Sequence, residues 1–183
     1  DALALLLTAL GVLVAGVEAG IALGILLSLA TIVWQASRPH IAIVGRVPGT
    51  EQFRNVNRVA VETLPHVLAL RIDENLFFGN VPAVEDELQR ALAAQPETTD
   101  VLLVMSSVSA IDMTALERLE ELNQSLAARG MRLHFSDLKG PVRDRLHRTS
   151  LLDTLSGHEF RFTHEAFERL GAARAPALVV NAA

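Results

Sequence analysis

The sequence predicts an α/β domain with a mixed β-sheet and flanking helices, preceded by an apolar segment that enters a membrane. Residues 2–36 contain a single ionisable side chain, that of Glu18, whereas residues 38–171 alternate short apolar runs with amphipathic helical patterns. Alternation of strands and helices along a chain is typical of an α/β fold. The chain has 183 residues and a net charge of −5, and almost all of its charge follows Ser37.

The apolar segment is too long for one straight transmembrane helix. A crossing needs about 20 apolar residues, whereas about 35 residues in one helix would reach about 52 Å. We expect one long broken helix or two short ones, with the break near Gly16, Glu18 and Gly20. Gly16, Gly20, Gly24 and Ser28 recur at every fourth position, which predicts a ridge of small side chains that another helix can approach closely.

Glu18 has two interpretations. An acidic side chain near the bilayer centre is costly and often marks an ion or substrate path. At a bend, or at the level of the lipid headgroups, it is a solvated turn residue. The flanking glycines predict a turn and favour the second interpretation, and Glu18 is retained as the candidate intramembrane acidic residue.

The charges that flank the apolar segment predict its orientation. Arg38 and Arg46 follow the segment closely and no Lys or Arg precedes it, which places the charged part in the cytoplasm. Trp34 lies where an interfacial aromatic residue is expected. Because the chain begins at Asp1 without a methionine or a basic leader, we interpret it as part of a longer multi-pass protein of the cell (inner) membrane.

This interpretation divides the chain into three parts. We expect terminal transmembrane helices over residues 1–37, in contact with membrane lipid, a cytoplasmic domain over residues 38–171, and a flexible tail over residues 172–183.

The cytoplasmic part opens with strands. Pro39 ends the apolar helix, and residues 41–47 form the first strand. Residues 50–65 are polar and irregular, which predicts a surface excursion. Two short apolar runs follow, at 67–72 and 76–78, and both have strand length.

Helices then alternate with strands. Asn80 can cap a helix over residues 81–92, and residues 101–105 are apolar on both faces, as in a central strand that is covered on two sides. The remaining predicted elements are a helix from the cap Asp112 to Leu126, a strand over 133–135, a helix from Gly140 through Leu152, and a last helix capped by Thr163.

Signatures of catalysis, metal binding and nucleic-acid binding are missing from the sequence. It has no phosphate-binding glycine loop, no G-x-S-x-G elbow and no H-E-x-x-H motif. The nearest histidine pair, His158 and His164, is separated by an apparent strand, and there are no cysteines. The mildly acidic domain lacks a basic stripe with interleaved aromatic residues. We therefore expect no enzyme, no metal site, no cofactor and no nucleic-acid partner.

One loop between a central strand and a helix start could bind an anion or act in regulation. Free backbone N–H groups at a helix N-terminus favour anions, and hydroxyl groups in this loop would be accessible to a kinase or a partner. The alternative is that Asp112 and Thr114 merely cap the helix. The candidate residues are Ser106, Ser107, Asp112, Met113 and Thr114.

Four stretches of the sequence resemble the end of a SulP-type anion transporter, in which the last membrane helices are followed by a STAS domain. The stretches are GVEAGIALGILLSL, RPHIAIVGRVPGT, RIDENLFFGNV and IDMTALERLEEL. The resemblance covers nearly the whole chain up to about Gly171, and the STAS fold is shared with bacterial anti-sigma-factor antagonists.

The resemblance implies a secondary anion transporter, usually a homodimer, whose STAS domain influences transport or assembly. Family substrates include sulfate, bicarbonate and dicarboxylates. The substrate site of such transporters lies between discontinuous helices near the midplane, so the resemblance assigns no substrate-binding residue to this chain. The partner of residues 1–37 would be an upstream transmembrane domain of the same protein. The alternative is a membrane-tethered STAS module that binds a protein or nucleotide partner and transports nothing.

The sequence departs from the anti-sigma-factor antagonists at one position. These proteins carry a phosphorylatable serine directly after the aspartate of the motif, where this chain has Met113. Thr114 follows, but a phosphate there would lie beside the carboxylate of Asp112, which opposes it. We therefore expect no phosphoswitch at this turn.

Overall fold

The computed structural model describes residues 2–172, and these divide into two compact units. We call the residues up to Arg38 the helical unit and those from Pro39 onward the α/β unit. Except for Ala172, the expected flexible tail lies outside the described residues.

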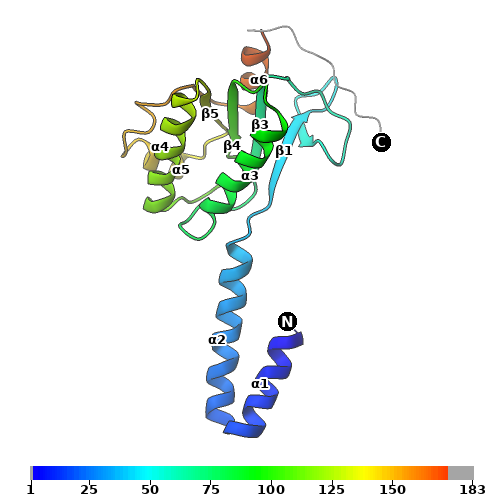
Figure 1. Ribbon diagram of the computed structural model, residues 1–183, viewed down its shortest axis with the longest axis vertical. Coiled ribbons are helices and arrows are strands. Elements are labelled where there is room, and N and C mark those ends of the chain that lie inside the picture. The colour runs from blue at the N-terminus through cyan, green and yellow to red at the C-terminus, as the bar shows by residue number, and fades with distance from the viewer. Residues whose placement is uncertain (1, 173–183) are drawn as a thin grey trace. The chain divides into compact units, whose positions relative to one another are not determined.

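The helical unit is an antiparallel pair of helices (Figure 1). Helix α1 runs over Ala2–Ala15 and α2 over Val17–Ala36. The helices break at Gly16, whose φ of 89° is left-handed and suits a residue without a Cβ. The break expected near Gly16 is confirmed.

Glycines let the two helices approach closely. A Cβ on Gly20 would lie 2.7 Å from the backbone nitrogen of Val12, and a Cβ on Gly24 would lie 3.7 Å from the Cβ of Thr8. The predicted ridge of small residues is therefore used, and α1 is the helix that meets it at Gly20 and Gly24.

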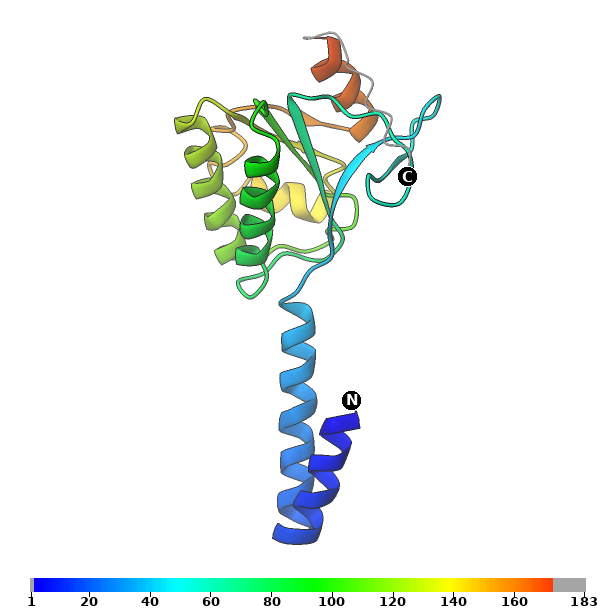
Figure 2. The same cartoon turned by 45° about the vertical axis from the view of Figure 1, so that its right-hand side comes forward.

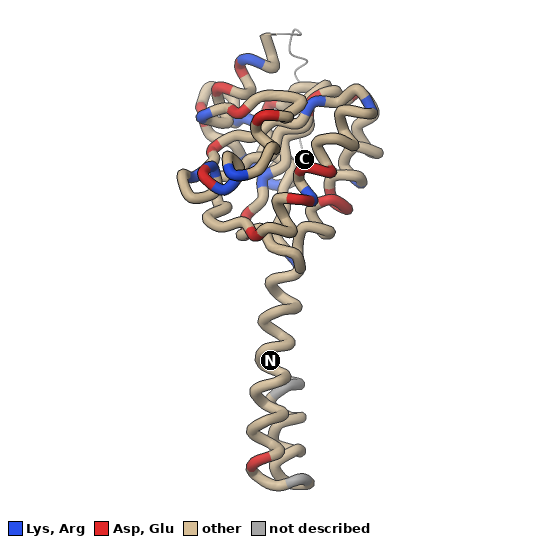
Figure 3. Tube along the Cα trace, turned by 90° about the vertical axis from the view of Figure 1, so that its left-hand side faces the viewer, with Lys and Arg blue, Asp and Glu red and all other residues tan. Residues whose placement is uncertain are grey.

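The rest of the helical unit exposes apolar side chains. Within the described residues, α2 is the one helix that is long and apolar enough to cross a membrane, with 20 residues and a mean hydropathy of 2.0. At its end the guanidinium carbon of Arg38 lies 4.7 Å from the centroid of the Trp34 ring, a pairing suited to the level of the lipid headgroups. Figure 3 shows how little charge this unit carries compared with the α/β unit.

The α/β unit is built on a six-stranded mixed sheet with the strand order β2-β1-β3-β4-β5-β6. Strand β1 pairs antiparallel with β2 and β3, and β3 through β6 are parallel. The strands are β1 (Ile41–Arg46), β2 (Phe53–Asn55), β3 (Val67–Ile72), β4 (Asp100–Val104), β5 (Arg132–Ser136) and β6 (Glu159–Phe160). The predicted α/β fold with a mixed sheet is confirmed.

Helices cover both faces of the sheet, because the central strands are apolar on both sides (Figures 1 and 2). On one face Leu70 and Leu103 pack with the buried sides of α3 (Val81–Ala94), α4 (Met113–Ala128) and α5 (Gly140–Leu146). On the other face Leu102 packs with α6 (Thr163–Ala172).

The α6 face contains a buried polar cluster where β4 and β5 begin. Asp100 accepts hydrogen bonds from His134 Nε2 at 2.9 Å and from Thr99 Oγ1 at 2.7 Å, and forms an ion pair with Arg132. His134 Nδ1 accepts a hydrogen bond from the backbone N–H of His158 at 2.9 Å, so Nε2 carries the ring proton.

A glycine makes this cluster possible. A Cβ on Gly157 would lie 2.3 Å from the carbonyl oxygen of Leu133 and 2.5 Å from His134 Nδ1. Any side chain at position 157 would therefore displace the histidine ring or the strand beside it.

Three predicted elements need correction. Residues 76–78 are not a strand: Leu76 forms one isolated bridge with Ile111, and the amide of Phe77 donates to Asn80 Oδ1 in a turn. The excursion over 50–65 contains β2, which is too short to show an alternating pattern. The helix from Gly140 ends at Leu146 instead of Leu152, because the hydroxyl of Thr149 donates to the Leu146 carbonyl and replaces the next helical turn.

The contact between α1 and α2 can be tested with a cysteine pair. The chain has no native cysteine, and the Cβ separation of 3.7 Å between positions 8 and 24 suits a disulfide. The double variant Thr8→Cys with Gly24→Cys should form an intramolecular disulfide on mild oxidation, seen as a loss of free thiol. Thr8→Cys with Ala22→Cys is the matched control, since position 22 lies about 200° around α2; equal oxidation of both pairs would contradict the packing.

The buried carboxylate makes a pH-dependent contribution to stability. Burial alone would raise the pKa of Asp100, but the hydrogen bonds from His134, Arg132 and Thr99 outweigh it and hold the pKa well below its usual range. The stabilisation is therefore complete above the unfolded pKa of about 3.9 and is lost as the pH falls through the lower folded value.

We predict that Asp100→Asn lowers the free energy of unfolding at pH 7 by about 1.5–3 kcal/mol and flattens its decline at acid pH. Urea unfolding followed by circular dichroism at several pH values measures both effects. Asp153→Asn, at an exposed carboxylate, is the control. An unchanged acid decline in Asp100→Asn would show that other carboxylates cause it.

Candidate functional site

The turn between β4 and α4 is organised by Asp112. Its Oδ1 accepts a hydrogen bond from the N–H of Ala115 at 2.8 Å, which makes it the N-cap of α4. Its Oδ2 accepts a second one, at 2.9 Å, from the N–H of Phe78 in the loop that follows β3. The capping role predicted for Asp112 is therefore confirmed, and the same carboxylate joins two loops.

Asn75 makes a second connection between the same loops. Its Oδ1 accepts from the N–H groups of Ser109 at 2.8 Å and of Ala110 at 3.0 Å. No motif in the sequence marks Asn75 for this role; the one available signal is its position directly before the apolar run 76–78. Lys139, from the loop before α5, donates to the hydroxyl of Ser109 at 2.8 Å and adds a positive charge beside the turn.

Met113 and Thr114 lie exposed at the start of α4. Within the described part of the chain, their backbone N–H groups donate to no acceptor. Two free amides at the N-terminus of a 16-residue helix favour negative charge nearby. The side chains of Met113 and Phe78 are 61% and 68% exposed and give the same region an apolar surface.

The five candidate residues do not form one site. Ser106 and Ser107 are exposed directly after β4, but Val108 and Ile111 are buried between them and the helix start. Ser106 lines a cavity together with Arg71 and Val104, and Val104 belongs to the α6 face of the sheet. Asp112 caps α4, and Met113 and Thr114 are its first residues; this helix packs on the opposite face.

Glu18 lies in the first turn of α2, two residues after the break at Gly16, and its side chain is exposed. An acidic side chain in a first helical turn complements the helix dipole. This position is the one expected of a turn residue at the tip of the helical hairpin.

The loop after β3 also holds an ion-pair cluster. Arg71 donates from Nε and Nη2 to the two carboxylate oxygens of Asp73 at 2.6 and 3.0 Å, and His40 Nδ1 lies 2.7 Å from Asp73 Oδ2. Burial raises the pKa of Asp73, but the hydrogen bonds from Arg71 and His40 lower it by more. The cluster connects His40, at the start of the α/β unit, to the end of β3.

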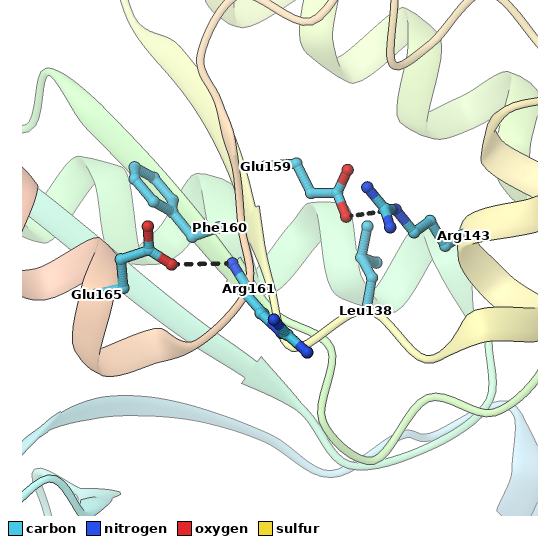
Figure 4. Close-up of a pocket in the computed structure, with 6 residues that line it drawn as sticks. All are labelled: Leu138, Arg143, Glu159, Phe160, Arg161 and Glu165. Carbon is cyan, nitrogen blue, oxygen red and sulfur yellow. Dashed lines mark hydrogen bonds and ion pairs between the residues drawn. The ribbon is translucent and has the colours of Figure 1, made fainter.

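A cavity of about 600 Å³ lies beside the edge strand β6 (Figure 4). Its charged side chains are already partnered or solvated: Arg143 Nε lies 2.9 Å from Glu159 Oε1, and Glu165 pairs with Arg169. Figure 4 also shows the backbone N–H of Arg161 donating to Glu165. The described side chains that line this cavity include no serine, threonine, cysteine, lysine or histidine.

A metal site requires several ligand side chains close together. Within residues 2–172, no group of three or more histidine, aspartate or glutamate side chains could hold an ion.

Comparison with known families identifies the α/β unit. A family model described as "STAS domain" matches residues 58–166. This stretch contains β3 through β6 and the helices α3 to α5.

Two of the similar curated proteins are named as sulfate transporters. Sulfate transporter 1.3 of Arabidopsis thaliana is 33% identical over 159 residues, which cover 81% of this chain and 24% of that protein. Sulfate transporter 2.1 of Arabidopsis thaliana is 30% identical over 182 residues, which cover 92% of this chain and 27% of that protein. The chain thus spans about a quarter of the length of the curated relatives it matches.

The fold also resembles that of a solved transporter. Murine Solute Carrier 26 family member A9, an anion transporter in the inward-facing state, superposes with a TM-score of 0.76 over 93% of this chain and 28% of its own. The sequence identity is 18%. This likeness extends to the fold alone.

The joint between the two loops can be tested at Asp112. We predict that Asp112→Ala lowers the free energy of unfolding by about 1–2 kcal/mol, because the N–H groups of Ala115 and Phe78 lose their acceptor. Hydrogen exchange should rise at Phe78 as well as in the first turn of α4. Glu117→Ala, an exposed position on the same helix, is the control; faster exchange in α4 alone would show that Asp112 does not hold the loop.

Proposed function

The chain belongs to the STAS domain family, and from that premise we propose that it forms the C-terminal part of a secondary anion transporter of the SulP type. The observation that carries the proposal is the extent of the similarity to sulfate transporters. It covers 92% of the chain in one relative and therefore extends beyond residues 58–166, which the STAS model matches. The relatives are transporters and not enzymes.

The helical unit supports this assignment. Helix α2, with 20 residues at about 1.5 Å each, has the length of one bilayer crossing. Helix α1 contributes a further 14 residues, Ala2–Ala15, almost all apolar, to the same hairpin. We infer that residues 1–37 are terminal membrane helices, in contact with lipid and with an upstream transmembrane domain of the same protein.

The substrate would be a small anion of the sulfate, bicarbonate or dicarboxylate type. Of these, sulfate is named for the relatives. No residue of this chain is assigned to the substrate site, which in such transporters lies at the midplane between discontinuous helices. Glu18 is proposed to be a solvated residue at the hairpin tip.

The domain predicted over residues 38–171 would lie in the cytoplasm and regulate transport or assembly of a homodimer. The positive charges of Arg38 and Arg46 after the apolar helices support the cytoplasmic location. We propose the exposed turn with Met113 and Thr114 as the regulatory contact, because it combines free amides, an adjacent cation and apolar surface.

A second candidate function is a membrane-tethered STAS module that binds a protein or nucleotide partner without transporting. The exposed side chains of Phe78 and Met113, side by side with the free amides of α4, favour this alternative. The two candidates differ in whether the complete protein moves anions.

Transport by the complete gene product decides between them. We predict that proteoliposomes of the full-length protein take up radiolabelled sulfate, and that unlabelled bicarbonate or dicarboxylate competes if either is also a substrate. Vesicles with residues 1–183 alone should take up none. Full-length protein that is folded yet moves none of the three anions would contradict the transporter and leave the tethered module.

A further inference from the structure

A recess of about 360 Å³ lies where two neighbouring strands of the sheet separate. The antiparallel ladder between β1 and β3 ends at the pair Ile43 and Leu70, whereas the ladder between β3 and β4 continues back to Val67. From Val44 onward, β1 pairs with β2. Over residues 67–69, β3 therefore has a strand partner on one side only, within the part of the chain that the structure describes.

The recess is mostly apolar. Eight of its eleven lining residues have apolar side chains, which come from β1, β3, the loop after β2 and the end of α3. Val44, Val67 and Ala69 are buried, Val56 is half-buried and Ala94 is exposed. Apolar surface that stays accessible in a recess of this size favours an apolar occupant, because that occupant leaves water on binding.

The polar groups of the recess offer little to a small polar ligand. The side-chain amide of Gln95 already donates to the carbonyl of Pro65 at 2.6 Å. Glu97 is the one charged side chain of the described lining; it is exposed and forms no ion pair within residues 2–172. The recess therefore fits an apolar group with a positive charge at its rim.

The chain contains a segment with this chemistry after α6. Residues 173–183 include three large apolar side chains in succession, those of Leu178, Val179 and Val180, and one basic side chain, that of Arg174. Leucine and the β-branched valines suit an extended segment that packs on a sheet. A cation followed by apolar residues matches a carboxylate at the rim and an apolar interior.

The end of α6 lies close enough for this segment to reach the recess. The carbonyl oxygen of Leu170, near the end of α6, lies 3.1 Å from His66 Nε2. His66 directly precedes Val67, which lines the recess. Five extended residues after α6 span about 16 Å, so Leu178 can enter the recess.

We propose that the apolar segment 177–180 of the same chain occupies this recess and packs against β1 and β3. The recess is then an internal docking site, and a segment of another protein with similar chemistry can bind there only after residues 177–180 leave. The flexible tail expected over residues 172–183 is the alternative.

Cross-linking of the full chain in detergent tests the proposal. Because the chain has no native cysteine, the double variant Glu97→Cys with Val179→Cys has one thiol at the rim and one in the segment. A short bismaleimide should join them within one chain, seen as a monomer mass shift with loss of both free thiols. Val56→Cys with Val179→Cys, at a second lining position, should behave in the same way.

Arg169→Cys with Val179→Cys is the matched control. Arg169 is exposed, and its guanidinium carbon lies 6.0 Å from the ring centroid of Phe160 in β6, the strand at the far edge of the sheet from β1 and β2. A freely moving segment would reach position 169 at least as readily as position 97, because position 169 is only ten positions away along the chain. The docked segment should instead cross-link preferentially to positions 97 and 56.

A second set of variants tests whether apolar side chains hold the segment. Leu178→Asp with Val180→Asp, added to the Glu97→Cys and Val179→Cys pair, should abolish the preferential cross-link, because a carboxylate is unfavourable in an apolar recess. Ala182→Asp with Ala183→Asp adds the same charge outside the segment and should retain the cross-link.

Three results would overturn the proposal. One is stronger cross-linking at position 169 than at positions 97 and 56, as expected of a flexible tail. Another is a cross-link at position 97 that survives Leu178→Asp with Val180→Asp unchanged. The third is a cross-linked dimer in place of the monomer, which would assign the recess to the segment of a second copy.

Discussion

The side chains of β3 and β4 are buried on both faces of the sheet. This burial determines which helices must cover each face of the α/β unit. Leu70 and Leu103 need the cover of α3, α4 and α5, while Leu102 needs α6 on the other side. Apolar burial is non-directional and proportional to area, so it fixes which elements must cover the sheet. It does not fix which loops end up near one another.

Directional contacts add that second level of order. Asp112 and Asn75 hold the loop after β3 against the turn before α4 through three backbone amides, those of Phe78, Ser109 and Ala110. On the α6 face, the side chains of His134 and Ser136 interrupt the apolar lining of the sheet. Each finds a buried partner, Asp100 for the histidine and Thr163 for the serine. A fully satisfied polar cluster of this kind specifies one packing of the core.

The sequence predicted the features that depend on local patterns. The break at Gly16, the helix cap at Asp112 and the doubly covered strand over 101–105 follow from glycine conformation, capping chemistry and apolar burial. It missed β2, because three residues carry no periodic signal and the strand depends on pairing with β1. The strand predicted over residues 76–78 is wrong: their composition suits a strand, but Leu76 forms only an isolated bridge with Ile111 and no neighbouring strand pairs with them.

The sequence predicted the capping role of Asp112, which depends on a local pattern, but not that the five candidate residues would lie apart. Ser106 and Thr114 are only eight positions apart in the sequence. They nevertheless lie on opposite faces of the sheet, because Ser106 follows β4 on the α6 face whereas α4, which contains Thr114, covers the other face. The cavity that Ser106 lines joins segments from five parts of the chain, and no local sequence pattern predicts that these segments meet.

Gly157 shows how narrowly one position can be constrained. Every amino acid other than glycine has a Cβ, and that atom would overlap Leu133 and the ring of His134. A missense change in this codon would therefore disturb the pairing of the last two strands whatever residue it introduced, so among related genes the position should be nearly invariant for steric reasons alone.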